Sequence, residues 1–245
     1  AGESARRVGH KAVARVFSDI AAMGGTPMHL LVTLALPATT SMAWIDGFYA
    51  GARALCDKHL CRIAGGELTS LPDGAATVIS IAATGRIACG QAVLRSGGQA
   101  GDVLAVTGVL GGSFASGYHL DFEPRLAEGQ WLARHPEVHA MMDLSDGLAK
   151  DLPRLARASQ CAFRLDAAAL PLRPGCSAAQ AIGDGEDYEL LVAISAVAWP
   201  AIHTAWKRDF PDLPFTAIGE LRDAPMAAPQ DLAGGWDHFR RQAGR

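Results

Sequence analysis

Residues 138–158, VHAMMDLSDGLAKDLPRLARA, decide how the second half of this chain folds. The apolar segment 138–144 predicts a buried strand, and a helix is predicted to follow it over residues 146–158. Pro153 is an expected irregularity in that helix, because proline has no backbone N–H. The corner between strand and helix reads Asp143-Leu144-Ser145-Asp146-Gly147, so two carboxylates and a hydroxyl project from one place.

Strands and helices are predicted on both sides of this segment. In the second half, further strands are expected over residues 103–107, 161–165, 188–194 and 215–218. Helices are expected after the turn at Gly111-Gly112-Ser113, near residues 125–134 and near residues 197–208. The order of elements is typical of an α+β protein.

The first half is predicted to contain two helices and three strands. Apolar residues at three- and four-residue spacing predict a helix over residues 9–23, and a second helix runs from a cap at Ser41 to about residue 60. Strands are expected over residues 30–36, at residues 63–64 leading into Gly65-Gly66-Glu67, and over residues 76–83.

A glycine-rich polar stretch, residues 96–102, separates the two halves. We place a domain boundary there, which predicts domains of residues 1–97 and 98–245. The expected fold class is α+β with two domains, each a mixed β-sheet packed with helices. The chain has 245 residues, of which 49% are hydrophobic, and this is enough for such cores.

Composition narrows the possible partners. The net charge of −3 argues against nucleic acid and anionic membranes, so a small ligand is expected. The longest aliphatic run, residues 30–36, is far shorter than the about 20 residues of a membrane span. Five scattered cysteines without paired metal spacing indicate a reducing cytoplasm. Arg154 and Arg157 are interpreted as residues of a solvated helix face.

Several common catalytic motifs are absent from the sequence. It contains no P-loop, no His-Glu-x-x-His zinc helix and no Gly-x-Ser-x-Gly elbow. His59, His135 and His203 are interpreted as surface or hydrogen-bonded residues rather than ligands. The remaining candidates are acidic residues that stand beside glycine or at the ends of elements.

The corner at residues 143–147 allows two interpretations. Asp143 and Asp146, with Ser145 between them, could bind Mg²⁺, which prefers carboxylates together with phosphate and water. Alternatively, Ser145 or Asp146 caps the helix and accepts hydrogen bonds from its free backbone amides. The pattern alone favours the cap.

Two candidates in the first half also have alternatives. Asp19 lies in an apolar, alanine-rich predicted helix, where a carboxylate needs a partner, a cation or solvent. Gly65 and Gly66 would let the backbone approach a ligand closely while Glu67 points at it. The alternative for Gly65, Gly66 and Glu67 is a tight turn.

Residues 182–189, IGDGEDYE, place four acids just before a predicted buried strand. Such charge density is costly unless solvent or a cation engages it, so a solvated turn is the alternative to a binding site. Near the end of the chain, Trp236 follows Gly234-Gly235. Its indole could stack on a flat ligand ring or cover the edge of the core.

As a set, these motifs resemble those of one family, the thiamine-monophosphate kinases of the aminoimidazole-ribonucleotide-synthetase superfamily. The matching strings follow the family's order: GHKAVARVFSDIAAMGG, GGELTS, VLRSGGQAGD, DLSDGLAKDL, GDGEDYELL and GGWDHF. The resemblance implies an enzyme that uses ATP and several Mg²⁺ ions to phosphorylate thiamine monophosphate to thiamine diphosphate. It also implies two α/β domains and a homodimer formed through the first.

The resemblance further implies roles for individual residues. Metal ligands are expected at Asp19, Glu67, Asp143 and Asp146. ATP contacts are expected at Gly66, Glu67, Arg95 and Ser145, and substrate contacts at Glu186 and Trp236. No general base is assigned, because a monophosphate acceptor is already anionic.

The chain departs from the family pattern in two places. Glu67 stands where the family usually has aspartate, and its extra methylene shifts the carboxylate by about a bond length, which bears on Mg²⁺ geometry. Nothing before Gly9 resembles the family's leading segment, so the N-terminal domain is expected to be incomplete, either trimmed or lacking part of its site. Rival functions are a related enzyme with another acceptor and a non-catalytic protein that binds nucleotide or thiamine phosphate.

Overall fold

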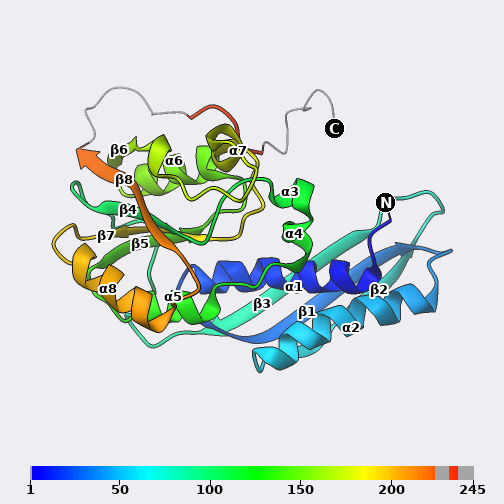
Figure 1. Ribbon diagram of the computed structural model, residues 1–245. Helices are drawn as coiled ribbons and strands as arrows, with labels where there is room; N and C mark the ends of the chain where they lie inside the picture. Colours follow the sequence, from blue (N-terminus) through cyan, green and yellow to red (C-terminus); the bar gives the residue numbers. More distant parts are fainter. Residues whose placement is uncertain (1, 224–231, 237–245) are drawn as a thin grey trace. The chain divides into compact units, whose positions relative to one another are not determined.

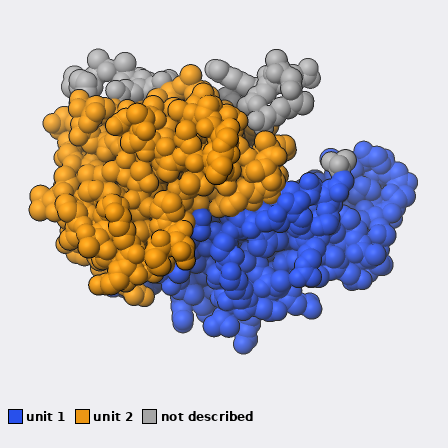
Figure 2. All heavy atoms as spheres, viewed as in Figure 1, with its two compact units in different colours: residues 1–92, 120–130 blue, residues 93–119, 131–245 orange. Residues whose placement is uncertain are grey.

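The computed structural model of the chain describes residues 2–223 and 232–236 (Figure 1). The chain forms two compact units, termed unit 1 (residues 1–92 and 120–130) and unit 2 (residues 93–119 and 131–245; Figure 2). The predicted division into residues 1–97 and 98–245 stays a prediction. None of the described helices is long and apolar enough to cross a bilayer.

Unit 1 is a mixed three-stranded sheet with two helices. Its elements are α1 (Ala5–Ala21), β1 (Thr26–Pro37), α2 (Met42–Lys58), β2 (Arg62–Leu71) and β3 (Val78–Arg86). The central strand β1 runs parallel to β2 and antiparallel to β3. The helices cover one face of this sheet (Figure 1), so that Leu30 and Val32 are fully buried whereas Leu31 between them is 52% exposed.

The helices of unit 1 are capped and packed through short-range contacts. Ser41 accepts a hydrogen bond from Trp44 N–H at 3.2 Å, which confirms it as the cap of α2. Ser4 caps α1 in the same way, so this helix begins four residues before the predicted start at residue 9. Gly9 of α1 faces the Phe48 carbonyl of α2, where a Cβ would clash and push the helices apart.

Gly65-Gly66-Glu67 lies inside β2, so the tight-turn alternative is wrong. These residues pair with residues 31–33 of β1 after a register shift that skips Ala64, a β-bulge. Gly66 has φ 151°, and a Cβ there would collide with the Val32 carbonyl. Glycine is therefore required for the close approach of β2 to β1.

Unit 2 contains a five-stranded sheet in the order β5-β7-β4-β8-β6, and its four ladders are antiparallel. Its strands are β4 (Val103–Thr107), β5 (Val138–Asp143), β6 (Cys161–Leu165), β7 (Leu190–Ile194) and β8 (Phe215–Asp223). Its helices are α3 (Ser113–Ser116), α6 (Leu148–Ala158), η1 (Ala167–Ala169), α7 (Ala178–Gly183) and α8 (Trp199–Asp209). The chain passes between the units within α4 (Tyr118–Asp121) and α5 (Leu126–Leu132).

Helices α6 and α7 lie on one face of this sheet and α8 lies on the other (Figure 1). Leu152 and Leu155 of α6 belong to the core cluster of the first face. On the second face, Trp206 of α8 packs on Phe215 with ring centroids 4.5 Å apart. All five residues of β7 are buried, because helices cover both sides of this strand. The predicted α+β class with two domains is confirmed.

Candidate active site

The corner, residues 143–147, joins β5 to α6 and runs beside the acidic loop, residues 183–189, which leads into β7. Asp143 pairs with Leu190 in the β5–β7 ladder. Three backbone hydrogen bonds of 2.8 Å continue this pairing: Leu144 N–H to Glu189 O, Tyr188 N–H to Leu144 O and Glu186 N–H to Ser145 O. Two segments separated in sequence are thereby held side by side.

A third segment, the tryptophan loop at residues 234–236, closes against the first two. Trp236 N–H donates to Asp146 O at 2.8 Å, and Gly235 N–H donates to Gly183 O at 3.1 Å. Gly235 has φ 80°, and a Cβ there would clash with the side chain of Lys150. The Trp236 side chain is exposed beside the corner. The rest of the predicted motif, residues 237–239, lies outside the described residues.

The helix cap predicted at the corner is wrong in its details. Gly147, with φ 96°, is the N-cap of α6, and neither Ser145 nor Asp146 caps the helix with its side chain. Instead, the carboxylate of Asp151 accepts hydrogen bonds from the backbone N–H groups of Ser145 and Asp146, both at 3.0 Å. The side chains of Ser145 and Asp146 are therefore not used to hold the start of the helix.

The sequence analysis interprets Arg154 as a residue of a solvated helix face, but in the structure this side chain also contacts two carboxylates. Its Nη1 lies 2.6 Å from Asp146 Oδ2 and 2.8 Å from Asp151 Oδ1. Desolvation raises the pKa of the fully buried Asp151 to about 6, although Arg154 opposes this shift. The Asp151–Arg154 pair is a feature that sequence reasoning missed, and the three-residue spacing of the two on one helix could have signalled it.

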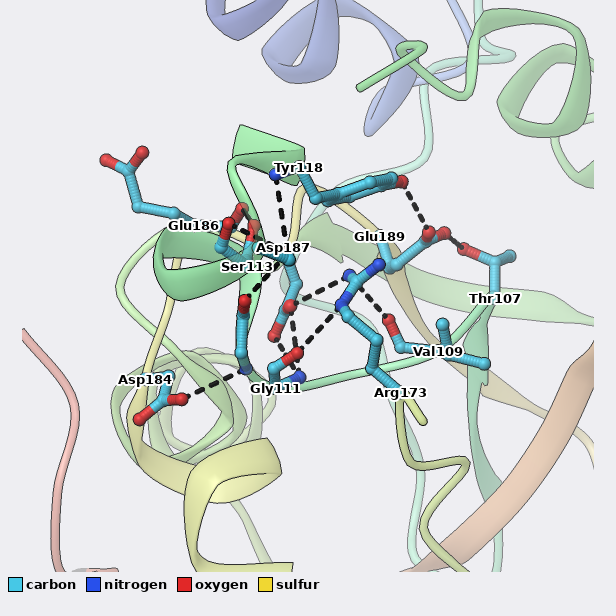
Figure 3. A network of polar contacts seen from close by, with 12 residues as sticks. Thr107, Val109, Gly111, Ser113, Tyr118, Arg173, Asp184, Glu186, Asp187 and Glu189 are labelled. Atoms are coloured by element: carbon cyan, nitrogen blue, oxygen red, sulfur yellow. Dashed lines mark hydrogen bonds and ion pairs between the residues drawn. The ribbon is translucent and has the colours of Figure 1, made fainter. Parts of the chain in front are cut away.

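Two acids of the acidic loop take part in a network of polar contacts (Figure 3). Asp187 is 1% exposed, and its carboxylate accepts from Gly111 N–H at 3.1 Å and faces Arg173 Nη2 at 3.5 Å. Glu189 is also 1% exposed and accepts from Thr107 Oγ1 at 2.7 Å and from Tyr118 Oη at 3.2 Å. The solvated-turn alternative is therefore wrong for these two acids.

The Arg173 guanidinium also lies 4.0 Å from the centre of the Tyr118 ring, so it is fixed by a cation–π contact as well as by Asp187. Desolvation raises the pKa of Asp187 to about 7, against the opposing effects of the Gly111 amide and Arg173.

Glu186 belongs to the same loop but turns its carboxylate away from the buried acids (Figure 3). Its backbone has φ 61° and is fixed by the Ser113 hydroxyl, which donates to Glu186 O at 2.5 Å. The side chain is 32% exposed, with one carboxylate oxygen 3.4 Å from His119 Nδ1. His119 in turn stacks on the exposed ring of Phe114 with centroids 4.5 Å apart. The sequence analysis singled out neither of these two rings.

The other predicted site residues are distributed between the units. Asp19 is exposed on α1, where partial desolvation raises the pKa of its carboxyl and Arg15 opposes the shift. Gly66 and Glu67 lie on β2, also in unit 1, and Glu67 is exposed. Arg95 is an exposed residue of unit 2, and its carbonyl accepts from Ser159 Oγ at 3.3 Å. The structure thus brings five predicted residues together in unit 2: Asp143, Ser145, Asp146, Glu186 and Trp236.

The donors at the corner suit a cation that is shared with a substrate. Within residues 2–223 and 232–236, no three His, Cys, Asp or Glu side chains form a metal-binding group of their own. The corner instead offers the two carboxylates of Asp143 and Asp146. Mg²⁺ is commonly held by one or two carboxylates and completed by phosphate oxygens and water, so this donor set fits Mg²⁺ bound together with a nucleotide.

Comparison with protein families first defines the class. Residues 3–87 match the model "AIR synthase related protein, N-terminal domain", and residues 99–223 match the C-terminal domain of the same description. The chain is therefore a two-domain protein of the AIR synthase related class.

Individual relatives define the family more narrowly. The chain is 37% identical over 230 residues to a thiamine-monophosphate kinase of Rhodopirellula baltica, covering 89% of this chain and 70% of that protein. The thiamine-monophosphate kinase structure from Stenotrophomonas maltophilia K279a is 31% identical to this chain, with a TM-score of 0.79. The match covers 90% of this chain and 77% of the other chain. The structure of AaThiL complexed with AMPPCP and TMP is 26% identical with a TM-score of 0.78, covering 97% and 82%. The chain belongs to the thiamine-monophosphate kinase family.

Proposed function

We propose that this chain transfers the terminal phosphoryl group of ATP to thiamine monophosphate and so forms thiamine diphosphate. The observation that carries this proposal is the meeting of the corner, the acidic loop and the tryptophan loop in unit 2. These segments contain five of the residues expected to contact metal, nucleotide or acceptor: Asp143, Ser145, Asp146, Glu186 and Trp236. The complex of the relative AaThiL with AMPPCP and TMP supports the same pair of substrates.

The metal and nucleotide assignments are part of the proposal. Mg²⁺, when bound, supplies positive charge that neutralises the phosphates and orients them for transfer. On unit 2, Asp143 and Asp146 provide carboxylate ligands from the corner. On unit 1, Asp19 and Glu67 are the proposed metal ligands. Gly66, Glu67, Arg95 and Ser145 contact ATP, with the Arg95 guanidinium suited to phosphate oxygens.

Glu186 and Trp236 select the acceptor. The partly exposed carboxylate of Glu186 can accept hydrogen bonds from an amino group on a heteroaromatic ring and can offset a positive ring charge. The exposed indole of Trp236 can stack on the flat ring. Because the acceptor phosphate is already anionic, the protein needs no general base and acts by positioning the two phosphates.

We further propose a homodimer that forms through unit 1 and acts in the cytoplasm. The sheet face opposite the helices exposes Leu31 on β1 and Val78 on β3, and a second copy would remove this apolar surface from water. The five cysteines are free, in keeping with a reducing compartment.

The proposed reaction is tested by measuring thiamine diphosphate and ADP formed from ATP, Mg²⁺ and thiamine monophosphate. We expect equal amounts of the two products from the unaltered chain, and a loss of at least about 100-fold in kcat/KM for Asp143→Asn. Asp212→Asn makes the same change at an exposed aspartate of unit 2 and should leave turnover unchanged. Full activity of Asp143→Asn would show that this residue is not part of the site. Binding of AMPPCP, together with no thiamine diphosphate formed from ATP, would exclude a kinase.

A further inference from the structure

Arg154 lies between two carboxylates that have different surroundings. A single nitrogen, Nη1, contacts Asp146 Oδ2 at 2.6 Å and Asp151 Oδ1 at 2.8 Å. Asp151 is fully buried, whereas the Asp146 side chain is 18% exposed and that of Arg154 is more exposed still. The guanidinium therefore bridges a structural acid and an acid that solvent and ligands can reach.

Asp151 has a fixed place in the protein. Its Oδ2 accepts the Ser145 and Asp146 N–H groups, so this carboxylate sets the backbone of the corner. Its Oδ1 faces Arg154. A buried carboxylate that lost its cation would be strongly destabilised, so Arg154 is expected to remain on Asp151 whatever happens at Asp146.

The contact between Arg154 and Asp146 has a different character. An ion pair between two partly exposed side chains is weak, so a divalent cation with stronger attraction for a carboxylate can replace it. A guanidinium close to a bound divalent cation would repel it, because both are positively charged. The carboxylate of Asp146 is therefore expected to bind either the metal ion or Arg154, and not both at once.

We propose that Arg154 is an exchangeable counter-ion of the corner, which occupies Asp146 until a divalent cation replaces it and then stays on Asp151 alone. This inference rests on the proposed function, because it takes Asp146 as a metal ligand. It assigns Arg154 as a positioning residue. When no metal is present, Arg154 offsets the negative charge of Asp146, which lies near Asp143 and Asp151 in the chain.

The test is a titration with Mn²⁺ in the presence of AMPPCP, in which electron paramagnetic resonance measures free Mn²⁺. Arg154→Gln removes the charge but keeps a donor for Asp151, and we expect it to lower the half-saturating Mn²⁺ concentration about fivefold. Arg154→Lys keeps the charge and should stay within about twofold of the unaltered chain. Arg157→Met removes an exposed arginine from the same helix and should change nothing.

The outcomes separate this proposal from the proposed function. Saturable Mn²⁺ binding that Arg154→Gln leaves unchanged or weakens would overturn the counter-ion role and leave the kinase assignment intact. No saturable Mn²⁺ binding by the unaltered chain with AMPPCP would overturn both. If Arg154→Gln does not fold, the side-chain NMR signal of Arg154 provides the test, and it is assigned by its absence in Arg154→Lys. We expect this signal to shift when Mg²⁺ is added with AMPPCP. A signal that does not shift contradicts the exchange.

Discussion

The acidic loop contains two kinds of carboxylate within four residues, and the contrast between them separates acids that hold the structure from an acid that a ligand can reach. Asp187 and Glu189 are 1% exposed, and backbone amides, hydroxyls and Arg173 satisfy them. Glu186, next to Asp187, has a side chain that is 32% exposed, with one carboxylate oxygen 3.4 Å from His119 Nδ1. Residue type and spacing do not distinguish these acids, whereas burial and hydrogen-bond partners do.

The same contrast applies at the corner. Asp151 is fully buried and accepts hydrogen bonds from two backbone amides, whereas the partly exposed carboxylate of Asp146 contacts Arg154, which also faces Asp151. In both segments a buried acid fixes the backbone and thereby places a more exposed acid next to it. Asp151, Asp187 and Glu189 should therefore control stability, and Asp146 and Glu186 should control ligand binding.

The largest expected effect comes from removing a buried acid. Asp187→Ala leaves the Gly111 amide without its acceptor and removes the carboxylate that faces the Arg173 guanidinium, and we expect it to lower the free energy of unfolding by about 3 kcal/mol. Urea denaturation followed by circular dichroism measures this change. Glu186→Ala, one residue away, should stay within about 0.5 kcal/mol of the unaltered chain. Equal destabilisation by the two variants would contradict the distinction drawn here.

The pH dependence of stability gives the next largest effect. The pKa of Asp187 is raised to about 7 in the folded chain from an ordinary value of 3.8, so the folded state binds a proton that the unfolded state releases. The stabilisation from this proton is complete below about pH 4 and is lost as pH rises through 7. Asp187→Asn cannot titrate, so its loss of stability between pH 5 and pH 8 should be smaller by on the order of 2 kcal/mol. Urea denaturation at both pH values tests this, and an identical pH dependence in the two proteins would place the titration elsewhere.

Local signals in the sequence were sufficient for much of the fold. The apolar runs 103–107 and 161–165, bounded by polar or glycine-rich residues, became β4 and β6 with the predicted bounds. Ser41 was recognisable as a cap because capping depends on residues three positions apart. The corner was recognisable because a strand, an acid pair and a helix follow one another directly.

Contacts between distant segments could not be predicted in this way. Arg173 meets Asp187 only because the chain folds back beside Gly111, and no sequence pattern encodes that return. Gly65 and Gly66 resembled a turn, yet a β-bulge and the close approach to Val32 place them in a strand. The meeting of Trp236 with Asp146 likewise depends on tertiary packing. Family resemblance gave each residue a role in binding, and periodicity placed neither beside the other.

Removing an exposed acid should affect binding and leave stability unchanged. Glu186→Gln keeps the size of the side chain but loses its charge, and we expect KM for thiamine monophosphate to rise about tenfold, equivalent to about 1.4 kcal/mol. KM for ATP should not change. Glu220→Gln, a partly exposed acid on β8 that pairs with Arg164 and Arg222, is the matched control. A rise in both KM values would indicate a general disturbance of the site instead of a contact with the acceptor.

The smallest expected effect concerns the ring of Trp236. Its backbone N–H is bound to Asp146 O, so the loop should keep its place when the side chain is changed. Trp236→Ala should raise KM for thiamine monophosphate about fivefold, about 1 kcal/mol, through loss of ring stacking, and Trp236→Phe should recover most of this loss. Steady-state kinetics on both variants, with the free energy of unfolding measured in parallel, separates the two roles left open by the sequence. If Trp236 instead covers the edge of the core, both variants should lower stability, and KM should follow stability rather than the presence of an aromatic ring.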